Sequence, residues 1–497
     1  MRIERFLKAT TRRTAKVALY VAGLVAAVLA TIVVVFAVQA RLRLPDLQPW
    51  HRIELTEEFH AGRAGAPKTF PEYLALEERL FAELRKRVLD DPAVADRALV
   101  GRYNPASVPA QLALGGRHNR SYELVPPEVR GAVLLVHGLT DSPYSVRALA
   151  ETFFAHGFHV VVVRLPGHGT VPSGLVDTDW TDWYAVVELA ARHAAQRTRG
   201  KPFYAGGYST GAPLLALLAV RGLEDAGLPR PQRLFFLSAA IGVSKFAALA
   251  NVASTLSFLP YFEKAKWLDV LPEYDPYKYN SFTVNAGNQV FRLTRALHRE
   301  LTAAAEKGLL ERMPRVTAFE SVVDATVSAA DVVRGFMLRL PGPGNELVAF
   351  DFNRSDEWVG LIAPGPRNAF EQLRGAPALP FRLTVVTNAS PASRQVAVDV
   401  REAGSTEARA KSLGLEWPPG VFSVGHVALP FTIDDPVYGL SPKQTGPLAW
   451  TIGDLAVRGE SGAIVVPLGM FARLRSNPFF EVVRARIGAA IEADAGR

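Results

Sequence analysis

The sequence predicts an α/β protein with a mostly parallel central sheet that helices cover on both faces. Three apolar runs, 132–137, 159–164 and 203–208, have the length and composition of buried strands, and turns and helical stretches alternate with them. Strands that are connected through helices in this way pair in parallel. The loops after the strands then gather at the carboxyl edge of the sheet, so functional residues are expected in these loops.

The third strand ends in a tight Gly/Ser turn. Residues 207–211 read GYSTG, and the apolar helical run 212–220 follows directly. Strand, Gly-x-Ser-x-Gly and helix in this order are typical of a nucleophile elbow, which holds a serine hydroxyl clear of the chain. Glycines are needed on both sides of Ser209 because a Cβ there would collide with the neighbouring strand or helix. A chain with 39 glycines also contains short Gly/Ser patterns by chance, so the motif gains weight only from its surroundings.

Two further turns follow the first and second strands. Residues 137–143 read HGLTDSP, and residues 165–170 read LPGHGT. In the first of these turns, the backbone N–H of Leu139 is expected to face the position where a carbonyl oxygen becomes an oxyanion during acyl transfer. The N–H of Thr210, directly after the serine, is expected to supply the second donor of this oxyanion hole.

These three blocks in register resemble the α/β-hydrolase family, specifically its bacterial serine esterases and lysophospholipase-like enzymes. The resemblance covers roughly residues 131–439 and is strongest over 131–220. It implies the α/β-hydrolase fold with a helical cap inserted after one of the strands. It also implies a catalytic serine, acid and histidine in that chain order.

The resemblance implies Asp324 as the acid. The run 315–321 reads as a late strand, and residues 321–327, SVVDATV, are similar to the family's acid loop, with Ser321 in the place of the usual glycine. The alternative is a helix N-cap carboxylate ahead of the run 327–338, which contributes about 1 kcal/mol to stability and nothing to catalysis.

Chain order leaves two candidates for the histidine. Eight of the ten histidines precede Ser209, and His298 and His426 follow it. His298 lies in the helical run 289–301, which precedes the acid, so its chain order is wrong. His426 lies in the run 421–427, which is predicted to be a short strand leading into a Gly-His turn, and it is expected to be the general base. A structural turn histidine is the alternative.

The interval between acid and histidine departs from the family pattern. Asp324 and His426 are 102 positions apart, where a few tens are usual. Two strand-like runs lie in this interval, 347–352 and 382–387, and either of them can be the last strand of the core.

The expected chemistry is acyl transfer through the serine. His426 would take the proton of Ser209 as the hydroxyl attacks an acyl carbonyl, and Asp324 would hold the imidazole tautomer and stabilise the imidazolium. This chemistry needs no metal and no organic cofactor. The chain also has no cysteine and no His-Glu-x-x-His motif, so its sequence predicts no metal site.

Other polar and aromatic residues lie in or just past the same turns. The resemblance implies that His137 and His168 shape these turns through hydrogen bonds to the backbone. Asp141 is expected to be a turn or cap residue. Trp180 and Trp183 are candidate substrate contacts, with burial in the core as the alternative.

The start of the chain predicts attachment to a membrane. Residues 17–38 are 22 consecutive residues without a charge, and a bilayer-spanning helix needs about 20. The basic residues before this segment are Arg2, Arg5, Lys8, Arg12, Arg13 and Lys16. Their excess over Arg41 and Arg43, which follow the segment, predicts a cytoplasmic N-terminus and a body on the far side. With the resemblance to bacterial enzymes, this implies a single-pass anchor in a bacterial inner membrane and a periplasmic body. An uncleaved anchor is expected, and a signal peptide with a peptidase site at 38–40 is the alternative.

The same region accounts for nearly all of the net charge. Residues 1–43 carry eight Lys/Arg and one Glu, a net +7 of the chain's +8, so residues 44–497 are nearly neutral at +1. No Lys/Arg run with interleaved aromatic residues occurs, and nucleic acid is therefore not an expected partner.

The expected organisation has seven segments. They are a cytoplasmic tail (1–16), a transmembrane signal anchor (17–38), an N-terminal extension packed on the core (39–125), the first part of the α/β-hydrolase core (126–240), a cap or lid insertion rich in aromatic residues (241–312), the second part of the core with an insertion (313–440) and a C-terminal extension with a terminal helix (441–497).

Together these features predict a membrane-anchored serine hydrolase that cleaves carboxylic esters with Ser209, Asp324 and His426. The expected substrate is a small-molecule or lipid-like ester: a lysophospholipid, a monoacylglycerol or a small foreign ester. An acyltransferase with the same triad is one alternative, since it differs only in excluding water. A non-catalytic hydrolase-fold protein that binds a partner at the membrane is the other, although a binding protein has no need of a serine in a strained turn.

Overall fold

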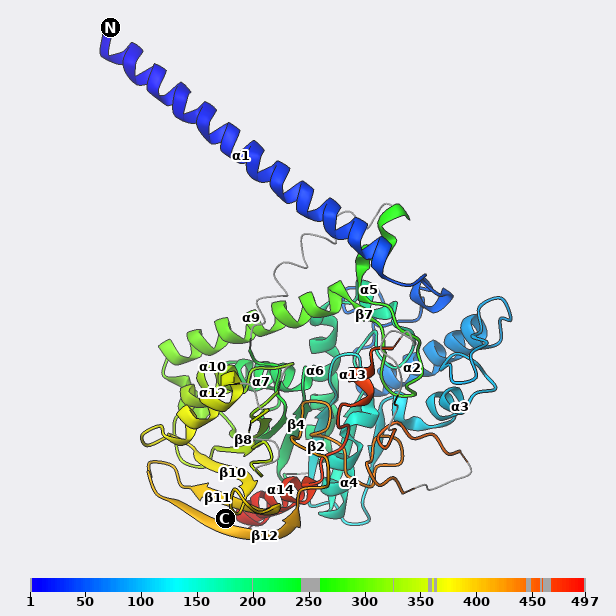
Figure 1. Cartoon of the computed structure of the whole chain (residues 1–497), viewed down its shortest axis with the longest axis vertical. Coiled ribbons are helices and arrows are strands. Elements are labelled where there is room, and N and C mark those ends of the chain that lie inside the picture. Colours follow the sequence, from blue (N-terminus) through cyan, green and yellow to red (C-terminus); the bar gives the residue numbers. More distant parts are fainter. Residues whose placement is uncertain are drawn as a thin grey trace.

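A ten-stranded, mostly parallel sheet forms the centre of the computed structural model (Figure 1). The structure describes residues 2–198, 200–242, 260–324, 326–355, 360–361, 364–443, 448–455, 458 and 466–495. The strands run across the sheet in the order β1-β3-β2-β4-β5-β8-β9-β10-β11-β12. All neighbours from β3 to β10 pair in parallel, whereas β1 at one edge and β11 and β12 at the other pair antiparallel. The predicted α/β class with a mostly parallel sheet is confirmed.

The elements have the following bounds. The strands of the large sheet are β1 (Tyr122–Leu124), β2 (Gly131–Val136), β3 (Phe158–Val163), β4 (Phe203–Tyr208), β5 (Arg233–Leu237), β8 (Arg315–Ser321), β9 (Glu346–Phe350), β10 (Arg382–Asn388), β11 (Gln395–Arg401) and β12 (Ala408–Glu416), and a separate pair is formed by β6 (Trp267–Asp269) and β7 (Phe282–Thr283). The α-helices are α1 (Arg2–Arg43), α2 (Phe70–Leu84), α3 (Val108–Gly115), α4 (Arg147–Ala155), α5 (Gly174–Asp177), α6 (Trp180–Arg197), α7 (Gly211–Arg221), α9 (Val284–Glu306), α10 (Ala329–Gly335), α12 (Pro364–Arg374), α13 (Leu468–Phe471) and α14 (Phe480–Ala495). Short helical turns are η1 (Pro49–His51), η2 (Arg85–Leu89), η3 (Arg117–Asn119), η4 (Pro143–Val146), η6 (Pro260–Lys266), η7 (Leu309–Arg312) and η8 (Met337–Arg339).

Helices cover both faces of the sheet because each strand turns alternate apolar side chains to opposite sides. In β2, Leu134 belongs to the apolar cluster formed with α2, α6, α7 and α9, and the next residue, Leu135, belongs to the cluster formed with α4 and α14. The inner strands β2, β3, β4 and β5 are buried along their whole length. A functional site can therefore form at the carboxyl edge of the sheet, where the strands end and the loops begin.

The two strand-like runs between the expected acid and histidine are both strands of the sheet. β9 pairs in parallel with β8 on one side and with β10 on the other. β11 and β12 then continue the sheet outward as antiparallel strands. These additions account for the long interval between Asp324 and His426.

The short strand predicted at 421–427 is wrong. Within the described residues, the run makes one isolated β-bridge, between Ser423 and Phe352, and no strand. The chain here returns from the edge strand β12 to the middle of the sheet, where each inner strand already has two paired neighbours. The apolar run therefore crosses the carboxyl ends of the strands as a loop.

The first helix, α1, projects away from the body, and its C-terminal end lies beside η6 (Figure 1). It contains the segment 17–38, for which the sequence predicts a membrane span. Among the residues that the structure describes, no helix combines the length and the apolar character that crossing a membrane requires.

The expected cap is described in part. Residues 243–259 lie outside the described residues. The remainder contains η6, the β6–β7 pair and α9, which lies along one face of the sheet with α6 and α7 (Figure 1).

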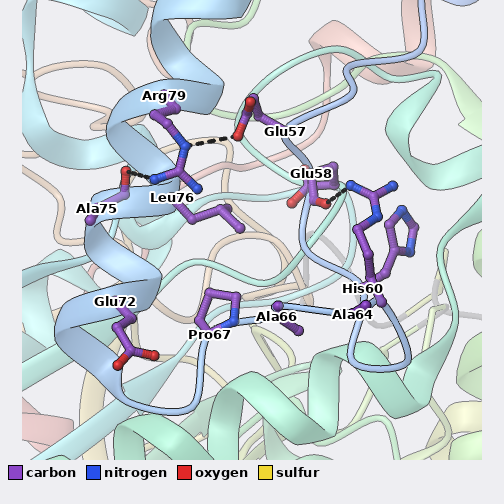
Figure 2. Close-up of a pocket in the computed structure, with 12 residues that line it drawn as sticks. Glu57, Glu58, His60, Ala64, Ala66, Pro67, Glu72, Ala75, Leu76 and Arg79 are labelled. Carbon is purple, nitrogen blue, oxygen red and sulfur yellow. Dashed lines mark hydrogen bonds and ion pairs between the residues drawn. The ribbon is translucent and has the colours of Figure 1, made fainter.

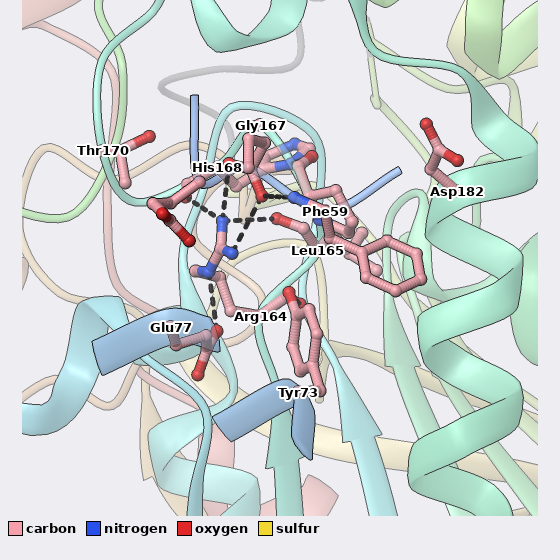
Figure 3. Close-up of polar contacts among 12 residues, drawn as sticks. Phe59, Tyr73, Glu77, Arg164, Leu165, Gly167, His168, Thr170 and Asp182 are labelled. Carbon is pink, nitrogen blue, oxygen red and sulfur yellow. Dashed lines mark hydrogen bonds and ion pairs between the residues drawn. The ribbon is translucent and has the colours of Figure 1, made fainter. Parts of the chain in front are cut away.

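A buried ion cluster around Arg164, just after β3, fixes the N-terminal extension to the core (Figure 3). The guanidinium is fully buried and donates to Glu77 Oε1 of α2 at 2.6 Å and to the two carboxylate oxygens of Glu58 at 3.0 and 3.1 Å. It also donates to the carbonyl of His168 at 3.0 Å, and the Tyr73 hydroxyl donates to the carbonyl of Arg164 at 2.9 Å. Burial raises the pKa of Glu77, while the Arg164 charge opposes this rise. The cluster thus joins the extension to the turn that contains His168.

Replacing Arg164 by an uncharged side chain tests this role. Arg164→Met leaves Glu58 and Glu77 buried without their cation, and we expect the free energy of unfolding, measured in urea, to fall by about 3 to 5 kcal/mol. Arg382→Met is the matched control, because it removes an exposed ion pair with Glu402 and should cost less than about 1 kcal/mol. Equal losses in the two variants would show that the buried cluster does not fix the extension.

Candidate active site

Ser209 lies in a strained turn between β4 and α7. Its φ is 51°, in the left-handed region that non-glycine residues rarely adopt. A Cβ on Gly207 would lie 2.5 Å from the carbonyl carbon of Gly211, and a Cβ on Gly211 would lie 2.2 Å from the carbonyl oxygen of Val136. Both glycines are therefore required for the turn, as the sequence predicts, and the nucleophile elbow is present.

A hydrogen-bonded line of three side chains runs through the elbow. His426 Nε2 lies 3.1 Å from Ser209 Oγ, and His426 Nδ1 lies 2.8 Å from Asp324 Oδ2. The imidazole is 5% exposed and the Asp324 side chain is fully buried. In this geometry Nδ1 carries the proton that is donated to Asp324, so Nε2 is free to accept the proton of the serine hydroxyl. The structure thus brings together the three residues that the sequence assigns to catalysis.

The Asp324 carboxylate has a structural contact as well. Its other oxygen, Oδ1, accepts the backbone N–H groups of Thr326 at 2.7 Å and Val327 at 2.9 Å. The cap of the following helix, α10, is a different residue, Ser328. The carboxylate therefore closes its own turn with one oxygen and faces the histidine with the other, which fixes its orientation.

The two expected oxyanion donors face no partner within the described residues. Neither the N–H of Leu139 nor that of Thr210 makes a hydrogen bond there. The residue after Leu139 is Thr140, whose φ is 63° and whose carbonyl accepts the N–H of Tyr279 at 2.8 Å. Two N–H groups without partners among the described residues, one in the turn after β2 and one directly after the serine, are the arrangement that stabilises a developing oxyanion.

The histidines of the neighbouring turns bond to the backbone. His137 Nδ1 donates to the carbonyl of Gly138 at 2.8 Å, and its Nε2 accepts the N–H of Leu165 at 3.0 Å. His168 Nδ1 donates to the carbonyl of Pro166 at 3.0 Å. Burial lowers the pKa of His137 well below its ordinary value and that of His168 to about 4, so both rings are neutral. These contacts position the turns around Ser209.

The two tryptophans that were candidate substrate contacts are packing residues in this structure. Trp183 is fully buried and its indole N–H donates to the carbonyl of Pro166 at 3.0 Å, while Trp180 is 9% exposed. Both belong to the apolar cluster that joins α6 to α9 and the sheet. The apolar residues in the first turns of α6 pack into this cluster because they must be buried. The two indole rings therefore have little surface left for a substrate.

Sequence reasoning missed Glu320, a buried carboxyl group four positions before the acid in the chain. It lies inside β8, is 1% exposed, and its Oε1 accepts the N–H of Ala239 at 2.8 Å. Its Oε2 has no partner within the described residues, and burial raises its pKa well above the ordinary value. The signal that would have found it is the one carboxylate in β8, directly after Ala318 and Phe319.

A cavity of about 350 Å³ lies apart from this site, in the N-terminal extension (Figure 2). Charged side chains from the loop before α2 and from α2 itself line it, among them Glu57, Glu72 and Arg79. It contains none of Ser209, Asp324 and His426. No group of three or more potential metal ligands occurs among the described residues.

Part of the chain is similar to known proteins. Residues 127–336 match the family model described as Serine aminopeptidase, S33 (Hydrolase_4). Over 96 residues, 19% of this chain and 38% of the relative, the chain is 38% identical to a thermostable monoacylglycerol lipase of Bacillus sp. (strain H-257). The chain thus spans well under half the length of that curated relative.

Two solved structures are each similar to about half of the chain. One comes from LipS and LipT, two metagenome-derived lipolytic enzymes, with 22% identity over 47% of this chain and 87% of that chain and a TM-score of 0.37. The other is a monoacylglycerol lipase of Paleococcus ferrophilus, with 19% identity over 46% of this chain and 88% of that chain and a TM-score of 0.35.

Proposed function

Since the chain belongs to the α/β-hydrolase family, we propose that it is a serine hydrolase that cleaves carboxylic esters through an acyl-serine intermediate. The observation that carries this proposal is the line from Ser209 Oγ to His426 Nε2 at 3.1 Å and from His426 Nδ1 to Asp324 Oδ2 at 2.8 Å. A nucleophile, a base and an orienting acid within hydrogen-bond reach of each other are the parts that acyl transfer needs.

The reaction proceeds in two halves. Ser209 Oγ attacks the ester carbonyl carbon while His426 Nε2 takes the hydroxyl proton, and Asp324 stabilises the imidazolium. The N–H groups of Leu139 and Thr210 bind the carbonyl oxygen as it becomes negative, and each such donor typically contributes about 3 to 4 kcal/mol. The alcohol leaves with the proton of His426, and a water molecule activated by the same histidine then releases the acid from the serine.

We propose a lipid-like ester as the substrate. The relative that is similar over 96 residues is a monoacylglycerol lipase, which supports a monoacylglycerol or a lysophospholipid over a small foreign ester. The aromatic composition of the cap segment points in the same direction, because an acyl chain needs an apolar cover.

Ester hydrolysis by paired variants tests the function. The full chain should hydrolyse p-nitrophenyl esters, with the optimum at longer acyl chains, and Ser209→Ala should remove this activity. His426→Ala should lower kcat at least about 10³-fold because the base is lost. His298→Ala is the matched control and should keep the wild-type rate, since within the described residues the hydrogen bond of His298 Nε2 is to the carbonyl of Ile241 at 3.1 Å.

Two results would contradict the proposal. A folded wild-type chain without turnover across the ester series would point to acyl transfer or to a binding role. Activity that survives Ser209→Ala would place the chemistry at another residue.

We also propose that the segment 17–38 anchors the chain in a bacterial inner membrane, with a cytoplasmic N-terminus and a periplasmic body. The structure gives this proposal no support, because no helix among the described residues is long and apolar enough to cross a membrane. What supports it is the run of 22 uncharged residues after a basic segment, together with the large apolar side chains of α1 that are exposed, such as Leu19 at 72% and Leu24 at 66%.

A charge within the segment tests the anchor. Val28→Arg places a cation near the middle of the span, where it costs about 2.5 to 3.5 kcal/mol, so we expect more of this variant in the carbonate-soluble fraction of cells than of the wild type. Leu42→Arg, outside the segment, is the control and should stay with the membranes. A wild-type chain that alkaline carbonate already releases would contradict the anchor.

A further inference from the structure

The cap holds the turn that carries the oxyanion donor Leu139 through two consecutive residues. The backbone N–H of Tyr279 donates to the carbonyl of Thr140 at 2.8 Å. Lys278 Nζ lies 3.6 Å from Asp141 Oδ1. Thr140 and Asp141 directly follow Leu139, so the cap fixes both the backbone and the charge at this point of the site.

The Asp141 carboxylate lies close to the nucleophile. A Cβ on Gly138 would be 3.0 Å from Asp141 Oδ2, 3.0 Å from Ser209 Cβ and 3.0 Å from Tyr208 Cε1. Asp141 and Ser209 thus border the same glycine, which directly precedes Leu139. Asp141 is 5% exposed, so water screens its charge poorly.

The charged groups around Asp141 come from several elements. Burial and the nearby Asp275 raise the pKa of Asp141, whereas Lys278 and His426 lower it. The negative charge of Asp141 in turn raises the pKa of Tyr208 and Tyr438, in addition to their burial. Among these groups Lys278 is the permanent cation at neutral pH.

Lys278 is itself held in place. Asp275 is fully buried, and its Oδ1 accepts the N–H groups of Tyr277 at 3.0 Å and Lys278 at 3.2 Å and the hydroxyl of Tyr438. The backbone of the cap is therefore fixed directly before the ammonium group that reaches Asp141.

We propose that Lys278 is a positioning residue for the oxyanion hole, because its ammonium group neutralises Asp141 beside the Leu139 donor. An ionised and unpaired carboxylate there would repel the negative charge that develops on the substrate carbonyl oxygen, and it would weaken the stabilisation that the two N–H groups supply. This inference rests on the proposed esterase function. It gives the cap a role in the chemical step.

The pH dependence of kcat tests this role. In Lys278→Met, Asp141 loses its cation and the pKa of Asp141 rises. At low pH the carboxyl group is then protonated and does not repel the oxyanion. As pH rises it ionises, and we expect kcat for a p-nitrophenyl ester to fall to about a tenth of the wild-type value at pH 8.5, with a smaller deficit at pH 6 and little change in KM. Lys278→Arg should restore kcat because it keeps the charge.

A second substitution separates the charge effect from a structural one. In Asp141→Asn combined with Lys278→Met, no carboxylate remains, so kcat should return to within about twofold of the Asp141→Asn single variant at every pH. Lys307→Met, which removes an exposed ion pair with Glu224, is the matched control and should leave kcat and its pH profile unchanged.

Each outcome decides the inference. Lys278→Met with a wild-type rate and pH profile overturns it. A deficit that is the same at every pH, or that persists in the double variant, also overturns it, because the role of Lys278 is then structural. A wild-type chain without turnover contradicts the proposed function instead, and the inference falls with it.

Discussion

The close approach of α7 to β2 and β4 is the constraint on which the site depends. Side chains at Gly207 and Gly211 would meet backbone atoms at 2.5 and 2.2 Å, so the helix can begin directly after the strand only because both positions are glycine. This turn holds Ser209 at the carboxyl edge of the sheet with a φ of 51°. The loop after β5 is then fixed to it, since the N–H of Ala240 donates to the carbonyl of Ser209 at 3.1 Å.

His426 is far from Ser209 in the chain, but residues next to the turn hold its backbone in place. The hydroxyls of Tyr208 and Ser238 donate to the carbonyl of His426 at 3.4 and 3.5 Å, so the end of β4 and the loop after β5 hold its backbone. The chain between Asp324 and His426 can therefore carry additional strands without disturbing the site. The entropy cost of a longer connection grows only slowly with its length, which is why an insertion of β9 to β12 is tolerated.

The features that could be predicted from the sequence are those set by local pattern. Apolar runs marked the inner strands, paired glycines marked the turn at Ser209, and chain order selected Asp324 and His426. The strand predicted before His426 failed for a non-local reason, because this apolar run forms a loop where the inner strands already have partners. The contact of Lys278 with Asp141 joins segments far apart in the chain, and no periodicity marks it.

The central claim is that Ser209 is the nucleophile, and covalent labelling tests it most directly. The full chain would be treated with a fluorophosphonate, digested and examined by peptide mass spectrometry. The account predicts one adduct, on the peptide that contains Ser209, absent in Ser209→Ala and formed much more slowly in His426→Ala. An adduct on another peptide, or no adduct on folded protein, would contradict the account.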